Sequence, residues 1–146
     1  MNYWPHLTAV LVGAGLTIQV GMNATVRSVI GSPVLAAIVN FMVGLAALAF
    51  VALASGARWT PGSTGAVPAW AWLGGLLGAA YVAATTVLGP RLGAAALLAL
   101  TLAGQMLAAL LVDHYGVIGF PPSQVTPARL LGAALLVTGV LLIMRR

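Results

Sequence analysis

The sequence predicts an all-α membrane protein with five transmembrane helices, and its composition and hydropathy pattern carry this prediction. The chain has 146 residues, of which 62% are hydrophobic and only 5% are charged. Soluble domains carry about 25% charged residues, so this chain could not cover its surface with polar groups. Apolar runs recur at transmembrane length, and the short alternating segments typical of membrane β-barrels are absent from the sequence. We therefore expect one five-helix transmembrane domain over residues 1–146.

The first three expected helices lie in the first 88 residues. Tyr3 and Trp4 are typical of the membrane interface, and the segment after them reads as a spanning helix rather than a signal peptide, because no positively charged region precedes it. The break "RSVIGSP" separates the first span from the second, and "SGARWTPGSTGAVPAW" separates the second from the third. These spans are expected at Pro5–Val26, Pro33–Leu53 and Ala69–Leu88.

The last two expected helices are separated by "DHYGVIGFPPSQVTP". The break "LGPRLG" is so short that the third and fourth helices are expected to form an antiparallel hairpin. Proline costs little near a helix start because its missing N–H is not needed there, so Pro5, Pro33, Pro90 and Pro127 are interpreted as lying at or near such starts. The spans are expected at Leu92–Val112 and Pro127–Met144, the latter short enough to stand nearly upright.

Basic residues mark the expected loops. Six basic residues against one acidic residue give a net charge of +5. Most of them fall singly between apolar runs, as in membrane-protein loops, rather than clustering as a nucleic-acid surface would require. Across five spans, four arginines share the face of the C-terminus and two lie on the other. This bias favours a cytoplasmic C-terminus only weakly, so it also permits insertion in both orientations.

Three polar side chains lie four residues apart in the first apolar run, namely Gln19, Asn23 and Arg27. In a helix this spacing places them on one face, with Gly15 one turn earlier. Interhelical hydrogen bonds of this kind contribute only about 0.6 kcal/mol each, so three in a row favour the wall of a polar pathway. Arg27 also suits the C-terminal end of a helix, where a cation complements the dipole. The expected pathway residues are Gln19, Asn23, Arg27, Asn40, Tyr81 and Gln105.

The single acidic residue, Asp113, is expected at the C-terminal end of a helix, where the dipole disfavours an anion. Arg129 is expected in the first turn of the next helix, where the dipole disfavours a cation. Two opposite charges in unfavourable places predict a structural ion pair, with His114 or Arg58 as other partners for the acid. The alternative is proton coupling at Asp113–His114, because histidine titrates near neutral pH.

The sequence gives no basis for enzymatic chemistry. It has no cysteine, no serine in a histidine and aspartate setting, no metal-ligand cluster and no phosphate loop. We expect no enzyme, no cofactor and no metal. Gly132 and Gly139 lie seven residues apart on one face of the expected fifth helix and predict a close helix contact between two copies.

The order of motifs resembles the YdcZ-like inner-membrane exporters of the drug/metabolite transporter superfamily. The motifs are "GLTIQVGMNATVR", "NFMVGLAALAF", "WLGGLLGAAYV", "GPRLGAAALLALTLAGQMLAALLVDHYGVIG" and "GAALLVTGVLLI". The resemblance implies a five-helix half-transporter whose larger relatives carry two such units in opposite orientation. It also implies the inner membrane of a bacterium. Small multidrug exporters of the same superfamily use a glutamate in their first helix, and this chain has none.

These observations predict a small dimeric transporter, an exporter of a small solute that works by alternating access through a cavity between two five-helix units. The partners are the lipid bilayer, a second copy in parallel or antiparallel orientation or a paired homologous subunit, and an unidentified solute; nucleic acid is not expected. The alternatives are a small dual-topology channel, since polar stripes also line pores, and a membrane subunit that transports nothing.

Overall fold

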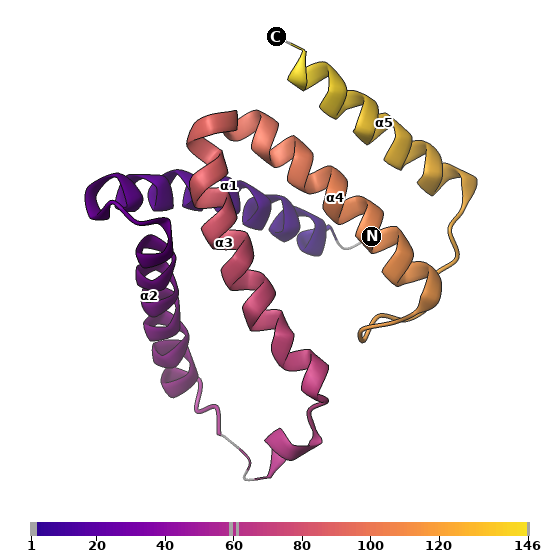
Figure 1. Ribbon diagram of the computed structural model, residues 1–146. Coiled ribbons are helices and arrows are strands. Elements are labelled where there is room, and N and C mark those ends of the chain that lie inside the picture. The colour runs from indigo at the N-terminus through magenta and orange to yellow at the C-terminus, as the bar shows by residue number, and fades with distance from the viewer. Residues whose placement is uncertain (1–2, 59, 61, 146) are drawn as a thin grey trace. The chain divides into compact units, whose positions relative to one another are not determined.

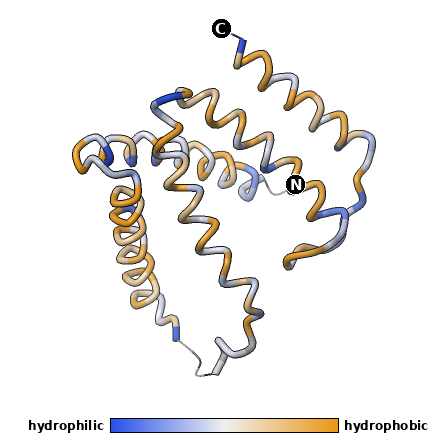
Figure 2. The backbone as a smooth tube through the Cα atoms, in the orientation of Figure 1, coloured by the Kyte–Doolittle hydropathy of each residue, from blue (hydrophilic) through white to orange (hydrophobic). Residues whose placement is uncertain are grey.

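The computed structural model describes residues 3–58, 60 and 62–145, which form helices and connecting loops without a strand (Figure 1). Five of these helices are long and apolar enough to cross a membrane. Figure 2 shows hydrophobic residues along each of them and hydrophilic residues mainly near their ends. The predicted all-α, polytopic membrane fold is confirmed. The elements are α1 (Trp4–Ile30), α2 (Pro33–Ala54), η1 (Ser63–Ala66), η2 (Ala69–Trp72), α3 (Leu73–Leu92), α4 (Ala94–Tyr115) and α5 (Pro127–Met144).

The chain divides into two compact units, an N-terminal unit over Met1–Arg91 and a C-terminal unit over Leu92–Arg146. The N-terminal unit holds α1 to α3, and the C-terminal unit holds α4 and α5. The expected α3–α4 hairpin and the single five-helix domain concern the relation between these units and stay predictions. Arg146, one of the arginines that bias the orientation, lies outside the described residues.

In the N-terminal unit, a turn of two residues joins α1 to α2, and the two helices pack against each other. Gly31 stops α1 because it adopts a left-handed conformation with φ 80°, and its N–H donates to the carbonyl of Arg27 at 2.8 Å. Ser32 then begins α2 by accepting a hydrogen bond from the N–H of Leu35 at 3.3 Å. Helix α1 therefore reaches Ile30 instead of ending at the expected Val26.

The prediction that Pro90 marks a helix start is wrong, because Pro90 lies inside α3, near its C-terminal end. The break comes three residues later at Gly93, whose φ of 80° is unfavourable for other residues. The expected start of this span at Ala69 is occupied by η2, so α3 begins at Leu73. Proline is tolerated within a membrane helix where a neighbouring group can satisfy the carbonyl that it leaves without a partner.

In the C-terminal unit, α4 and α5 pack side by side and are joined by a loop that folds back onto the end of α4 (Figure 1). The N–H of Ser123 donates to the carbonyl of Asp113 at 2.7 Å. Gly116 caps α4 in a left-handed conformation with φ 59°. Thr126 begins α5 by accepting a hydrogen bond from the N–H of Arg129 at 3.3 Å.

We expect Gly116→Ala to lower the stability of the fold more than Gly119→Ala does. Both glycines have positive φ, at 59° and 83°, so alanine at either site costs about 1 kcal/mol of backbone strain. Only at Gly116 would the added Cβ meet another group, the Cβ of Pro122 at 2.8 Å. The melting temperatures of the two purified variants in detergent test this. Equal decreases in melting temperature would show that the loop at Pro122 rearranges to accommodate the added Cβ.

Candidate functional site

The candidate site is a group of polar side chains within the apolar helices of the N-terminal unit. We call it the polar cluster, and it comprises Gln19, Asn23 and Arg27 on α1, Asn40 on α2, and Thr85 and Thr86 on α3. The buried residues of this unit include Asn23, Thr85 and Thr86, with exposed fractions of 4%, 3% and 0%. The remaining buried side chains are small, at Ala36 and Ala37. The interior of this unit is therefore polar and built from small groups.

Gln19 and Asn40 join α1 to α2. The Nε2 amide of Gln19 donates to Oδ1 of Asn40 at 3.2 Å, and both side chains are half-buried. Each amide keeps a further donor or acceptor, because an Asn or Gln side chain carries two N–H donors and a carbonyl with two lone pairs. The pair can therefore hold two helices together and still offer hydrogen bonds to a solute.

Asn23 lies one helical turn beyond Gln19 and has a different environment. Its side chain is 4% exposed and makes no hydrogen bond to any other described residue. Its polar atoms are not sealed, because no fully buried side-chain nitrogen or oxygen in the described part of the chain lacks a partner. A buried amide without a partner costs about 1–3 kcal/mol. The small part of Asn23 that stays accessible therefore includes its amide atoms, which require a hydrogen-bonding partner.

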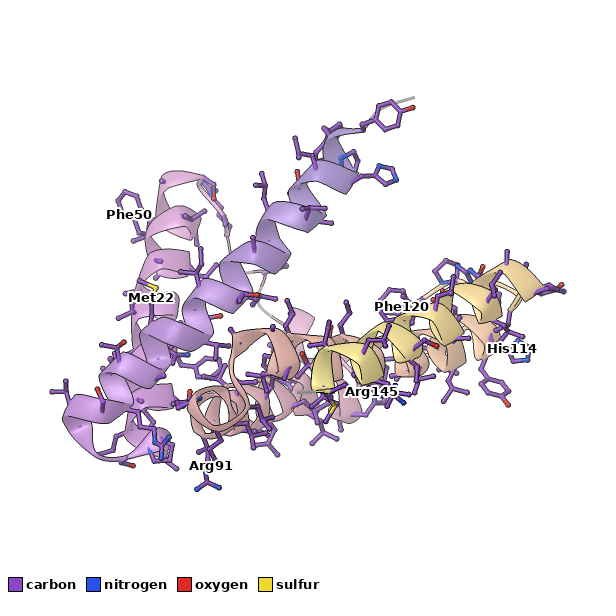
Figure 3. The ribbon with its side chains drawn as sticks, turned by 90° about the horizontal axis from the view of Figure 1, so that it is seen from above. Met22, Phe50, Arg91, His114, Phe120 and Arg145 are labelled. Carbon is purple, nitrogen blue, oxygen red and sulfur yellow. The ribbon has the colours of Figure 1, made fainter. Side chains whose placement is uncertain are left out.

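Arg27 turns toward α3. Its Nη1 donates to the backbone carbonyl of Thr86 at 3.3 Å. In a regular helix that carbonyl would accept the N–H of the residue four positions on, which here is Pro90 and has no N–H. The guanidinium thus satisfies the carbonyl that the proline leaves open. Arg91, by contrast, projects away from the helices (Figure 3).

The other two expected pathway residues lie outside this arrangement of hydrogen-bonded side chains. Tyr81 is half-buried on α3, and its carbonyl accepts the hydroxyl of Thr85 at 2.9 Å. Gln105 is exposed on α4 in the C-terminal unit. The proposed roles of both residues in a pathway stay predictions.

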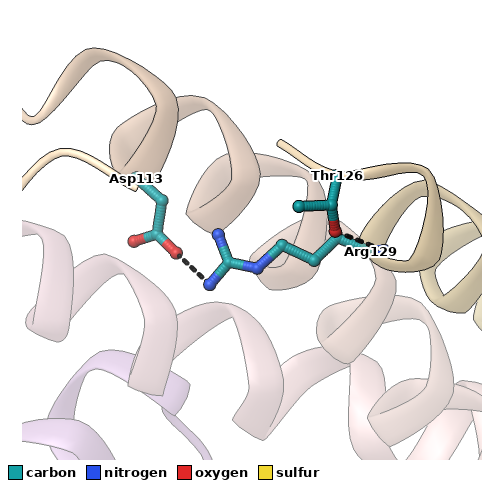
Figure 4. A network of polar contacts seen from close by, with 3 residues as sticks. All are labelled: Asp113, Thr126 and Arg129. Atoms are coloured by element: carbon teal, nitrogen blue, oxygen red, sulfur yellow. Dashed lines mark hydrogen bonds and ion pairs between the residues drawn. The ribbon is translucent and has the colours of Figure 1, made fainter. Parts of the chain in front are cut away.

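Asp113 and Arg129 form an ion pair between α4 and α5, with Oδ2 and Nη2 3.3 Å apart (Figure 4). Their side chains are 29% and 40% exposed. Thus the partner of Asp113 is the guanidinium of Arg129 rather than the imidazole of His114. A groove of about 370 Å³ beside the pair is otherwise apolar, and it is lined by Met106, Ala109, Leu110, Asp113, Arg129, Gly132, Ala133 and Leu136.

The His114 side chain has different neighbours from the side chain of Asp113. Its ring lies edge-on to that of Tyr115, with centroids 5.0 Å apart, and its side chain is exposed (Figure 3). It also borders a second, apolar groove of about 410 Å³ together with Leu107 and Leu130. This position brings no acidic group to the imidazole, so it supplies no geometric support for an Asp113–His114 relay.

The two glycines expected at a dimer contact lie on α5. Gly132 is exposed and Gly139 is half-buried. A Cβ added at either position would meet no atom of the described chain within 4 Å. Close packing inside the C-terminal unit therefore does not explain either glycine.

The Thr86 carbonyl, the partner of Arg27, is not among the expected site residues. The signal was present, because a proline four residues after Thr86 frees its carbonyl whenever both lie in one helix. With Pro90 at a helix start, Thr86 and Pro90 would not share a helix and the carbonyl would not be freed.

The comparison with protein families gives one match. The family described as "Putative inner membrane exporter, YdcZ" matches residues 4–142, which include the polar cluster and the Asp113–Arg129 pair. This finding confirms the resemblance that the sequence motifs indicate. No curated protein and no solved structure matches the chain.

Proposed function

The chain belongs to the YdcZ family of inner-membrane exporters, and we propose from this that it exports a small solute from a bacterial cell by alternating access, working as a dimer. In this proposal a cavity between two five-helix units opens to one side of the membrane and then to the other. The polar cluster lines it.

The observation that carries the proposal is the unpartnered amide of Asn23 between two hydrogen-bonded groups of the same helix face. Gln19 bonds to Asn40 and Arg27 bonds to the Thr86 carbonyl, while Asn23 between them bonds to no described residue. Polar groups in a membrane interior are costly unless they find a partner or a wet cavity. A passing solute with hydrogen-bonding groups would supply that partner.

Two features support a dimer. A chain of five spans is small for a transporter, since related cavities form between paired repeats near the bilayer midplane. The glycine face of α5 also has no partner within the C-terminal unit, and small residues allow membrane helices to approach closely. The weak arginine bias is compatible with an antiparallel pair.

We expect the double substitution Gly132→Leu and Gly139→Leu to break the dimer while each chain still folds, because the leucine side chains keep two α5 helices apart. Cross-linking and size-exclusion chromatography of the purified protein measure the effect. Ala134→Leu, at an exposed position on α5, is the matched control and should leave the dimer intact. An unchanged dimer in the glycine variant would place the contact elsewhere.

Flux into proteoliposomes over a panel of small solutes tests the proposed function. A carrier gives flux that saturates with concentration and exchanges labelled for unlabelled solute across the membrane. Fast flux without saturation would favour the channel, and absence of flux for every solute would favour a subunit that transports nothing. Cysteines placed near each terminus and labelled from outside intact cells report the orientation, since an antiparallel homodimer exposes both termini.

A further inference from the structure

We propose that Arg27 and Asn23 together form a binding site for a carboxylate group, so that the transported solute is a small monocarboxylate. The inference rests on the proposed transport function for its physiological meaning. The site itself is a property of the N-terminal unit and can be tested without transport.

The Arg27 guanidinium lies against α3. Helix α1 has 27 residues and is about 40 Å long, which exceeds the hydrocarbon thickness of about 30 Å. An arginine in its last turn could extend to the lipid headgroups. Instead its Nη1 donates to the carbonyl of Thr86, which lies six residues before the end of α3 at Leu92, or about 9 Å along the helix. Pro90 supplies the reason, because it leaves that carbonyl open.

The contact with the Thr86 carbonyl leaves most of the N–H donors of Arg27 unused. A guanidinium has five N–H donors in a planar fork, and the Thr86 carbonyl occupies only Nη1. The other edge of the fork matches the two oxygens of a carboxylate. Asn23, four residues earlier, lies on the same helix face as Arg27, is 4% exposed, and its amide bonds to no other described residue. Its N–H₂ group can donate to the same carboxylate.

The positive charge of Arg27 has no acidic residue to balance it within residues 1–91. The only acidic residue of the chain is Asp113, so residues 1–91 contain no carboxylate to neutralise Arg27. Arg27 is half-buried, and a charge removed from water is costly without a counter-ion. One monocarboxylate cancels one guanidinium, whereas a phosphate dianion would leave a net negative charge and a cation would add a second positive one. The site therefore favours a single carboxylate.

The substitution Asn23→Asp tests the site, because it places a carboxylate of the protein itself on the same helix face as Arg27. If the site is as proposed, the new acid pairs with Arg27, and the melting temperature of the purified full chain stays within about 2 °C of the native value. In the Arg27→Gln background the same change should lower it by about 5 °C or more, since the acid is then buried without a counter-ion. An equal loss in both backgrounds would overturn the proposal.

Gln19→Glu is the matched control, because it adds a carboxylate to the same helix face two turns from Arg27. Infrared spectroscopy gives a second readout that does not depend on the stability of the Arg27→Gln variant. A carboxylate paired with Arg27 stays ionised, so Asn23→Asp should show no added band of a protonated acid at neutral pH. The background is small because Asp113 is the only other acid. A protonated-acid band in Asn23→Asp would contradict the proposal.

Transport with lactate and its uncharged analogue lactamide as probes separates this inference from the proposed function. Uptake of lactate but not of lactamide supports both proposals. Uptake of lactamide alone supports transport and overturns the carboxylate site. If neither probe moves but the Asn23→Asp variant behaves as predicted, the carboxylate site holds and the failure lies with transport.

Discussion

The double substitution Gln19→Leu and Asn23→Leu is expected to abolish solute transport while expression and dimerisation stay close to normal. The physical reason is that, in the proposed pathway, both amides supply hydrogen bonds to the passing solute. Removal of two such partners costs about 1–3 kcal/mol each, which corresponds to a loss of roughly 5- to 140-fold for each amide. Proteoliposome flux and size-exclusion chromatography of the same preparation measure both outcomes.

The opposite outcome follows if these amides only hold helices together. The Gln19–Asn40 hydrogen bond joins α1 to α2, so its loss would then lower stability or assembly and leave residual transport in the fraction that folds. Met22→Leu is the matched control, because Met22 lies on the same helix and is 64% exposed. It should change neither property. Weakened assembly with retained flux in the double variant would refute the pathway.

Asp113→Asn is expected to destabilise the C-terminal unit by about 2 kcal/mol, and Asp113→Asn together with Arg129→Gln is expected to recover most of that loss. The single change leaves Arg129 without its counter-ion in the first turn of α5, where the helix dipole disfavours a cation. The double change removes both charges and both unfavourable dipole terms. The expected loss of stability is moderate because the side chains of Asp113 and Arg129 are 29% and 40% exposed, so solvent screens their attraction.

Thermal unfolding of the purified variants measures this rescue, and the pH dependence of transport separates the pair from a proton relay. A structural pair predicts that the double variant transports with an unchanged pH profile. A coupling role for Asp113 predicts that no change at Arg129 restores transport and that Asp113→Asn transports without pH dependence. Arg91→Gln, at an exposed arginine of the N-terminal unit, is the control for loss of one positive charge.

The fold could be predicted from the sequence because its signals are local and redundant. Apolar runs of transmembrane length fix the number of helices, and a glycine or a capping residue fixes many of their ends, as Gly31 and Ser32 do between α1 and α2. The spacing of Gln19, Asn23 and Arg27 also follows directly from the helical repeat. The opposing placement of Asp113 and Arg129 against two helix dipoles predicts the ion pair, whose Oδ2 and Nη2 atoms lie 3.3 Å apart in the structure.

The partners of the polar cluster could not be predicted in the same way, because they depend on which helices meet. The Gln19–Asn40 contact requires the packing of α1 on α2, and the Arg27–Thr86 contact requires α3 beside them. Pro90 shows the limit most clearly. The same residue fits the first turn of one helix or the last turn of the preceding one, and only the position of the break at Gly93 decides between them.

The contact between Arg27 and the Thr86 carbonyl also has a consequence for membrane insertion during synthesis. Helix α1 leaves the ribosome before α3, so Arg27 has no carbonyl to meet when its helix first enters the bilayer, and the guanidinium must then lie at the headgroups. There it acts as a positive flanking charge and helps to set the orientation of α1. It can withdraw to Thr86 only after α3 has inserted. We therefore expect the orientation of the first helix to depend on a charge that the finished protein binds to a carbonyl of α3.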